Sequence, residues 1–209
     1  MKLTEKNLAE FCDAIASKEP APGGGSVAAM SAAMGIGLVG MVANLTLGRK
    51  KYADHQDLMQ EILAEAESLR QKLVCAIDDD TEAYNAVSAV FSMPKETDAD
   101  KAARAAAMEA ALKAATEVPY EVMGLCRAAL ALAYRATGRC NTNAASDLGV
   151  AAHNLLAGTR GAWMNVLINL SGIKDEDFKA AKRRGGEEII AEAERMAKDV
   201  VEYVMAEIG

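Results

Sequence analysis

The chain has 209 residues, enough for one large domain or two small ones. Proline and aromatic residues are scarce (4 Pro, 3 Phe, 5 Tyr and 1 Trp), whereas strong helix formers are common, which disfavours a β-rich fold. The formal charge of −7 argues against non-specific nucleic-acid binding, because such binding depends on clustered Lys and Arg.

The cysteines and the N-terminus bear on metal binding and on the cellular compartment. Four cysteines lie far apart, without the spacing of a zinc site (Cys12, Cys75, Cys126 and Cys140). They are expected to be buried, reduced thiols, and neither a metal nor a cofactor is predicted. The first stretch, "MKLTEKNLAEFCDA", carries charges throughout and has no apolar signal-peptide region, which favours a cytoplasmic protein.

The chain begins with an expected helix, a loop and a second helix. Residues 4–17 carry apolar side chains at helical spacing and predict an amphipathic helix (Leu8, Phe11, Cys12 and Ile15). "SKEPAPGGGS" predicts a loop, since it holds two prolines and three glycines. A second helix is expected over about residues 26–48.

This second helix raises the question of a membrane span. No charge occurs from Ser26 to Leu47, and the length would cross a bilayer. Small residues, however, recur at intervals that let helices pack closely, and an uncharged helix is also typical of the centre of a large bundle. We expect the buried centre of a soluble bundle, with a membrane-associated bundle as the alternative.

The middle of the chain predicts three more helices. Residues 54–91 carry an apolar stripe, mostly at steps of three, four or seven (Ile62, Leu69, Leu73, Ile77, Tyr84, Val87 and Phe91). Residues 98–116 predict the next helix. Pro119, at a first-turn position, predicts the start of a separate helix that ends at Gly138.

The last third predicts two helices. One covers about residues 145–170, after the polar loop "GRCNTNAASD". The acidic "KDED" opens the other, which runs to Ile208 with an expected bend at Gly185 and Gly186. No repeat or linker divides the chain. The sequence therefore predicts an all-α fold, one domain over residues 1–209, built as an antiparallel bundle around the uncharged helix.

Asp80 is the strongest candidate for a functional carboxylate. It lies three residues after Ile77 and four before Tyr84, so it should face inward, while Asp78 and Asp79 should point to solvent. Burying an unpaired carboxylate is costly, so Asp80 belongs either to a site or to a structural ion pair.

A second polar group surrounds a helix start in "CNTNAASDLGVAAHN" (Asn141, Asn143, Asp147 and Asn154). Capping is one explanation, with Asn143 as the N-cap and Asp147 in the first turn. Asn154, and later Asn165 and Asn169, sit in apolar surroundings, where an amide can address the donor and acceptor edges of a heterocycle. Capping and ligand binding both remain open here.

The sequence predicts neither a nucleotide loop nor a serine-based triad. Its three successive glycines follow a helix and lack the strand that a nucleotide loop requires. The serines have no plausible base beside them, and His153 is expected to be structural.

Four residues directly after the uncharged helix form a basic cluster (Arg49, Lys50, Lys51 and Tyr52). Cations at a helix C-terminus are stabilising by about 0.3–1 kcal/mol, which is one explanation. The alternative is a clasp for an anionic ligand on an otherwise acidic protein.

Taken together, these motifs resemble those of the cyclodeaminase/cyclohydrolase family of folate enzymes. The matching segments are "PAPGGGSVAAMSAAMGIGLVGMVANLTLGRKKY", "DDDTEAYNAV", "NTNAASDLGVAA" and "NVLINL", in this order. The first segment is specific, whereas the later ones alone would be weak. The resemblance covers the whole chain.

The resemblance implies an all-helical homodimer that acts on tetrahydrofolate carrying a one-carbon unit. The expected reaction is hydrolysis of 5,10-methenyltetrahydrofolate to 10-formyltetrahydrofolate. The alternative is release of ammonia from 5-formiminotetrahydrofolate to give the methenyl compound. A free-standing chain favours the cyclohydrolase, since the deaminase is often fused to a formiminotransferase. A helical folate-binding or scaffold protein without activity is a third possibility.

Both reactions pass through a tetrahedral carbon between N5 and N10, which needs a proton-transferring group and a negative charge nearby. We expect Asp80 in this role, with Asp147 second. Three groups of residues are assigned to the substrate. The loop would approach it closely through Gly24, Gly25 and Ser26. The pterin would be oriented by Asn141, Asn143 and Asn154. The glutamate tail, which is expected to be polyglutamylated, would meet Arg49, Lys50, Lys51 and Tyr52.

Overall fold

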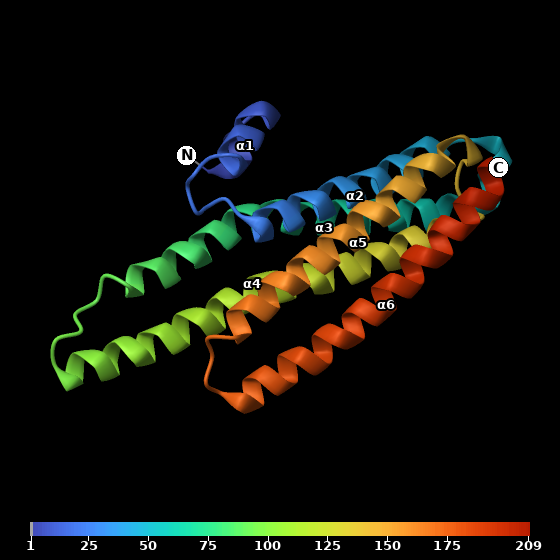
Figure 1. Cartoon of the computed structure of the whole chain (residues 1–209). Helices are drawn as coiled ribbons and strands as arrows, with labels where there is room; N and C mark the ends of the chain where they lie inside the picture. The colour runs from blue at the N-terminus through green and yellow to red at the C-terminus, as the bar shows by residue number, and fades with distance from the viewer. Residues whose placement is uncertain (1) are drawn as a thin grey trace.

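The computed structural model describes residues 2–209 and shows five long helices that run up and down in a bundle, with a short helix before them (Figure 1). In chain order the elements are η1 (Leu3–Glu5), α1 (Leu8–Ile15), α2 (Gly24–Thr46), η2 (Lys50–His55), α3 (Gln56–Val90), α4 (Asp98–Ala136), η3 (Thr142–Ala144), α5 (Ala145–Leu170) and α6 (Glu176–Ile208). No strand occurs in these described residues. The predicted all-α bundle is confirmed.

Helix α2 packs most extensively against α5 and α3, while one of its faces stays exposed and carries apolar side chains (Val27, Met34, Met41 and Leu45). Small residues bring α2 and α5 into backbone contact. A Cβ on Gly158 would lie 2.9 Å from the carbonyl oxygen of Ala28, and one on Gly35 would lie 2.8 Å from Cγ of Leu155. Substitution at either glycine would therefore push the two helices apart, and the prediction of close packing along this helix is confirmed.

Helix α2 also has the length and composition of a membrane span, the only such helix among residues 2–209. Over its most apolar stretch, 56% of the residues are buried inside the bundle. The core helix of a bundle has the same length and composition, and burial accounts for the missing charges on the packed faces of α2 but not for those on its exposed face.

The N-terminal part differs from the prediction of a single helix over residues 4–17. It divides into η1 and α1, because Asn7 caps a new helix and accepts a hydrogen bond from the Glu10 N–H at 3.0 Å. Of the expected apolar stripe only Phe11 is buried, whereas Leu8 is 67% exposed. The helical period was present, but α1 has too little of the bundle beside it to cover the whole stripe.

Helix α4 also differs, since residues 98–136 form one helix and Pro119 lies inside it rather than at a start. Helix α6 is continuous from Glu176 to Ile208 and is not interrupted at Gly185 and Gly186, where a bend was expected. These two glycines instead make room for aromatic side chains: a Cβ on Gly185 would collide with the Tyr120 hydroxyl, and one on Gly186 with the ring of Trp163.

The predicted stripe on α3 is buried in its first half only. Ile62, Leu73 and Ile77 are buried, whereas Tyr84 and Phe91 are 40% and 65% exposed. The later turns of α3 therefore extend beyond the packed core, and the side chains on one face of these turns are free to line a cavity. The cysteine prediction is half right, since Cys126 and Cys140 are buried but Cys12 and Cys75 are exposed.

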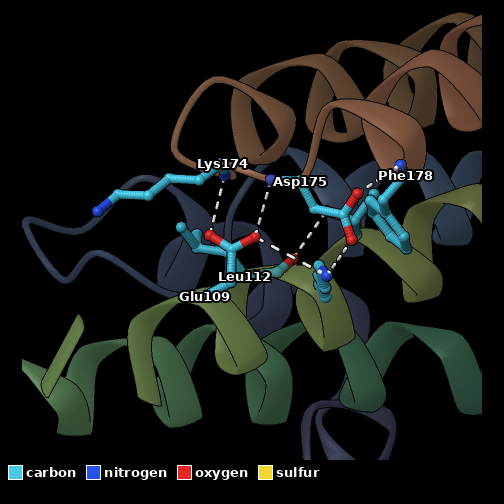
Figure 2. Close-up of polar contacts among 7 residues, drawn as sticks. Glu109, Leu112, Lys174, Asp175 and Phe178 are labelled. Atoms are coloured by element: carbon cyan, nitrogen blue, oxygen red, sulfur yellow. Dashed lines mark hydrogen bonds and ion pairs between the residues drawn. The ribbon is translucent and has the colours of Figure 1, made fainter. Parts of the chain in front are cut away.

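Polar contacts fix the turn between α5 and α6 against α4 (Figure 2). The carboxylate of Glu109 accepts hydrogen bonds from the backbone N–H groups of Lys174 at 2.9 Å and Asp175 at 3.1 Å. Asp175 caps α6 through the Phe178 N–H at 3.0 Å and accepts from Nζ of Lys113 at 2.6 Å. These contacts hold the C-terminal end of α5 beside the middle of α4, where the cavity described next is found.

Candidate active site

A cavity of about 280 Å³ opens where α2 begins, between the start of α2, the later turns of α3 and the end of α5. Its walls are formed by Pro20, Ala21, Gly23, Gly24, Gly25, Asp80, Ala83, Tyr84, Val87, Ala115, Asn165 and Asn169. Asp80 is the only charged residue in this set. The cavity is thus a partly apolar recess with one carboxylate and two amides.

Asp80 is held by the first turn of α2. Its Oδ2 accepts hydrogen bonds from the Ser26 N–H at 2.8 Å and from the Ser26 hydroxyl at 3.0 Å. Its Oδ1 has no such partner within the described residues and remains free toward the cavity. A Cβ on Gly25 would collide with this carboxylate, so the glycine is needed for the contact. The inward orientation predicted from the periodicity is what the structure shows.

The environment of Asp80 changes its acidity. Burial raises the pKa of this carboxyl above its ordinary value of 3.8, and the hydrogen bonds from the Ser26 hydroxyl and N–H oppose that rise without cancelling it. The carboxyl therefore holds a proton more readily than an exposed aspartate does. This property suits a group that takes up and returns a proton.

Asp78 contradicts the prediction that it points to solvent. It is only 8% exposed, and its carboxylate accepts hydrogen bonds from the Leu3 N–H at 2.6 Å and from the Thr4 hydroxyl at 2.7 Å. The segment η1 covers this side of α3, and a contact between residues 75 positions apart is invisible to helical periodicity. Asp79 is exposed, as expected.

The basic cluster lies at the other end of the bundle. A second cavity, of about 320 Å³, is lined by Arg49, Lys50, Lys51, Tyr52, Asn141, Thr142 and Asn143. Nε of Arg49 donates to the Leu45 carbonyl in the last turn of α2 at 2.7 Å, so Arg49 does complement that helix end. Lys50 and Lys51 are exposed and available to an anion.

Tyr52 and the asparagines build the floor of this second cavity. The Thr142 N–H donates to the Tyr52 hydroxyl at 3.0 Å. Hydrogen bonds with Thr142 lower the pKa of Tyr52, and the neighbouring Lys51 lowers it further. Asn141 is buried and accepts from the Asn143 N–H at 3.1 Å. Asn143 is not the helix cap that was predicted; the cap position of α5 is Ala144, which has no side-chain acceptor.

Three predicted site residues line neither of these cavities, namely Ser26, Asp147 and Asn154. Ser26 was expected to approach the substrate, but it is fully buried and contacts Asp80 instead. Asn154 lies midway along α5, where its carbonyl oxygen accepts from the Ser31 hydroxyl at 3.0 Å and its Nδ2 donates to the Val150 carbonyl at 3.0 Å. Asp147 lies in the first turn of α5, as the capping explanation expected. His153 is exposed on the same helix.

Apart from Asn154, the predicted substrate-binding residues thus fall into two groups at opposite ends of α2. Gly24, Gly25 and Ser26 are at its start, and the basic cluster follows its end. The 23 residues of α2 rise by about 34 Å. Figure 1 shows α2 running from the end near α1 to the end where the C-terminus lies. One chain therefore does not bring the two groups together.

Asn165 and Asn169 line the first cavity and were not among the assigned substrate residues. Their position in apolar surroundings was the signal that could have identified them. Tyr84 was assigned to the buried stripe but forms part of the same wall. Among residues 2–209, no three His, Cys, Asp or Glu side chains gather in the way a metal ion would require.

Comparison with known proteins places this geometry in a family. Residues 7–188 match the family model described as formiminotransferase-cyclodeaminase. The methenyltetrahydrofolate cyclohydrolase of Methylorubrum extorquens is 40% identical over 204 residues, which is 98% of each chain. The formimidoyltransferase-cyclodeaminase of Sus scrofa is 36% identical over 98% of this chain, which spans only 38% of that longer protein.

A solved structure agrees in fold over the whole length. The formiminotetrahydrofolate cyclodeaminase of Thermotoga maritima superposes with a TM-score of 0.81 at 31% identity, covering 99% of this chain and 98% of the other. The chain belongs to the formiminotransferase-cyclodeaminase family.

Proposed function

We propose that the protein is a folate one-carbon enzyme that hydrolyses 5,10-methenyltetrahydrofolate to 10-formyltetrahydrofolate. The observation that carries this proposal is the Asp80 carboxylate, fixed by Ser26 at the start of α2 with Oδ1 free in a partly apolar cavity. Similarity over nearly the full length of a protein named as this cyclohydrolase supports the same reaction.

The chemistry follows from the charge of the substrate. The methenyl carbon shares a positive charge with N5 and N10, and the Asp80 carboxylate stabilises that charge in a recess where water screens it little. Water adds to the carbon and gives a proton to Oδ1 of Asp80. The bond from carbon to N5 then breaks, N5 takes the proton from Asp80, and the hydroxyl proton leaves to solvent as the formyl group forms on N10.

The cyclodeaminase reaction is the second candidate, since the structural relative from Thermotoga maritima carries that name and is covered end to end. In this reaction too, bonds form and break at the one-carbon unit that joins N5 and N10. N10 attacks the formimino carbon on N5, and the proton of N10 passes to the imino nitrogen. Asp80 supplies a second proton to that nitrogen, which leaves as ammonia as the methenyl cation forms. The raised pKa of Asp80 suits either direction of proton transfer.

We further propose a homodimer in which the face formed by α2 and α5 is the interface. Seven large apolar side chains on this face are exposed in one chain (Val27, Met34, Met41, Leu45, Val150, Met164 and Ile168). A Cβ on Gly37, near the middle of the α2 part, would meet nothing within 4 Å. Glycine in a helix costs about 1 kcal/mol relative to alanine, and a partner helix lying close at this point would explain it.

Such a dimer would join the two separated groups of substrate residues. A two-fold axis across the middle of α2 sets the start of one α2 beside the end of the other. The cavity with Asp80 then faces the partner's basic cluster, whose lysines suit the carboxylates of a glutamate tail, single or extended. A monoglutamyl folate is too short to span the length of α2 within one chain.

A spectroscopic assay tests the proposed activity. Purified protein is mixed with 5,10-methenyltetrahydrofolate, and the loss of its chromophore is compared with the uncatalysed rate; 5-formiminotetrahydrofolate is offered in parallel. Catalysed loss with no formation from the formimino compound identifies the cyclohydrolase, and formation with release of ammonia identifies the cyclodeaminase. Folate binding without either reaction would reject an enzymatic role.

A further inference from the structure

Pro119 leaves a buried carbonyl group in α4 without its helical partner. In an α-helix the N–H of each residue donates to the carbonyl four positions earlier, and proline has no N–H. The carbonyl of Ala115 therefore loses its donor. Ala115 is only 7% exposed, and a buried carbonyl without a hydrogen bond is costly.

A side chain from another helix supplies the missing donor. Nδ2 of Asn169, on α5, donates to the Ala115 carbonyl at 2.9 Å. If the amide were turned over, its oxygen would face the carbonyl oxygen, and the two acceptors would repel each other. The proline therefore fixes which end of the Asn169 amide points to α4 and which end is left over.

The remaining end of the amide is an acceptor at the cavity wall. Asn169 and Ala115 both line the cavity that holds Asp80, and Oδ1 of Asn169 accepts no hydrogen bond from the described residues. Asn165, one turn earlier, is oriented in the same sense, because its Nδ2 donates to the Gly161 carbonyl at 2.9 Å. Each Nδ2 keeps a second N–H, and Oδ1 of Asn169 is the acceptor that the contact with α4 leaves at the cavity wall.

We infer that Pro119 is a positioning residue for the substrate site and that Asn169, held by it, selects a ligand with ring N–H donors. This inference rests on the proposed function, since a reduced pterin carries such donors at its amino group, N3 and N8. Oδ1 of Asn169 accepts one of them, beside the free Oδ1 of Asp80. A heterocycle that offers no donor along this edge leaves Oδ1 of Asn169 without a partner.

The test is a double-mutant cycle with Pro119→Ala and Asn169→Ala, followed by two readouts. Asn169→Ala should lower Tm and raise KM for 5,10-methenyltetrahydrofolate by about three- to tenfold, the worth of one neutral hydrogen bond. Pro119→Ala restores an N–H for the Ala115 carbonyl, so Tm should stay level or rise while KM increases by a similar factor. In the Pro119→Ala background, Asn169→Ala should change neither quantity much further.

A matched control is Pro94→Ala, which replaces an exposed proline in the loop before α4 and should leave KM unchanged. Additive effects of Pro119→Ala and Asn169→Ala on Tm would overturn the pairing. A wild-type KM in Pro119→Ala would overturn the positioning role. If the wild-type protein has no folate activity, the proposed function fails, and the Tm cycle still decides whether Pro119 and Asn169 act together.

Discussion

The proposed dimer leads to a quantitative prediction about mixed subunits. The start of α2 holds the Asp80 cavity and its end precedes the basic cluster, about 34 Å away along one helix. If one substrate needs both, Asp80 of one subunit must work with the lysines of the other. Two different damaged subunits can then complement each other within a single dimer.

The test uses two variants, each of which damages the group of site residues at one end of α2. Asp80→Asn removes the proton-transferring group, and the double variant Lys50→Ala, Lys51→Ala removes the two exposed lysines of the cluster. We expect each homodimer to lose at least tenfold in kcat/KM, because an acid or base contributes about 10²–10⁴-fold and a charge-assisted hydrogen bond at least about tenfold.

The mixed dimer has one damaged active site and one intact active site. Its first site pairs the substituted Asp80 with the substituted lysines, and its second pairs the native Asp80 with the native lysines. Co-expression with two different tags, followed by purification over both, isolates this species. Its kcat/KM, measured by the loss of the methenyl chromophore, should be about half that of the wild-type dimer, since one of two equivalent sites is complete.

A site built within each subunit gives a different result. Every site of the mixed dimer would then carry one of the two defects, and kcat/KM would stay at the level of the damaged homodimers. That result, or a wild-type protein that is monomeric while active, would refute the shared site. Asp79→Asn, an exposed neighbour of Asp80, is the matched control and should leave kcat/KM of either kind of dimer unchanged.

Three further predictions concern single residues. Gly25→Ala places a methyl group against the Asp80 carboxylate and should lower kcat by about a hundredfold while circular dichroism stays helical; normal turnover would mean that the contact is dispensable. Asp80 has a raised pKa in the fold, so its protonation stabilises the protein at low pH, and this contribution is lost as pH rises from 3.8 through the raised value. Asp80→Asn should flatten that part of the Tm–pH curve, and an unaltered curve would contradict the assignment. Glu109→Gln weakens acceptance from two backbone N–H groups and should lower Tm by about 2–4 °C; no change would show that the α5–α6 turn is held otherwise.

Local periodicity was sufficient for part of the site. Asp80 interrupts a stripe whose period is set by the helix itself, so its inward direction could be predicted from its spacing to Ile77 and Tyr84. Asp78 was predicted wrongly because its burial depends on η1, which folds back over α3 from the N-terminus. Sequence patterns describe how a helix presents its faces, but they do not say which distant segment covers each face.

The separation of the two site groups illustrates the same limit at larger scale. The glycines and the basic cluster flank a single uncharged stretch, and the resemblance to folate enzymes assigned both to one substrate. A helix converts 23 intervening residues into about 34 Å, so the regularity that made α2 predictable also places its ends too far apart for one short ligand. The exposed apolar face between them then becomes the natural place for a second copy.

Pro119 shows how a residue that breaks a local rule can identify a site. Proline is most favourable in the first turn of a helix, and from sequence alone a helix start was the better prediction. The structure instead retains it inside α4, where its cost is offset by a donor from Asn169, 54 positions beyond Ala115. The Ala115 carbonyl accepts from Asn169, and both residues belong to the same cavity wall. Alanine at position 119 would suit the helix better, so retaining proline there is best explained by what it does to Asn169.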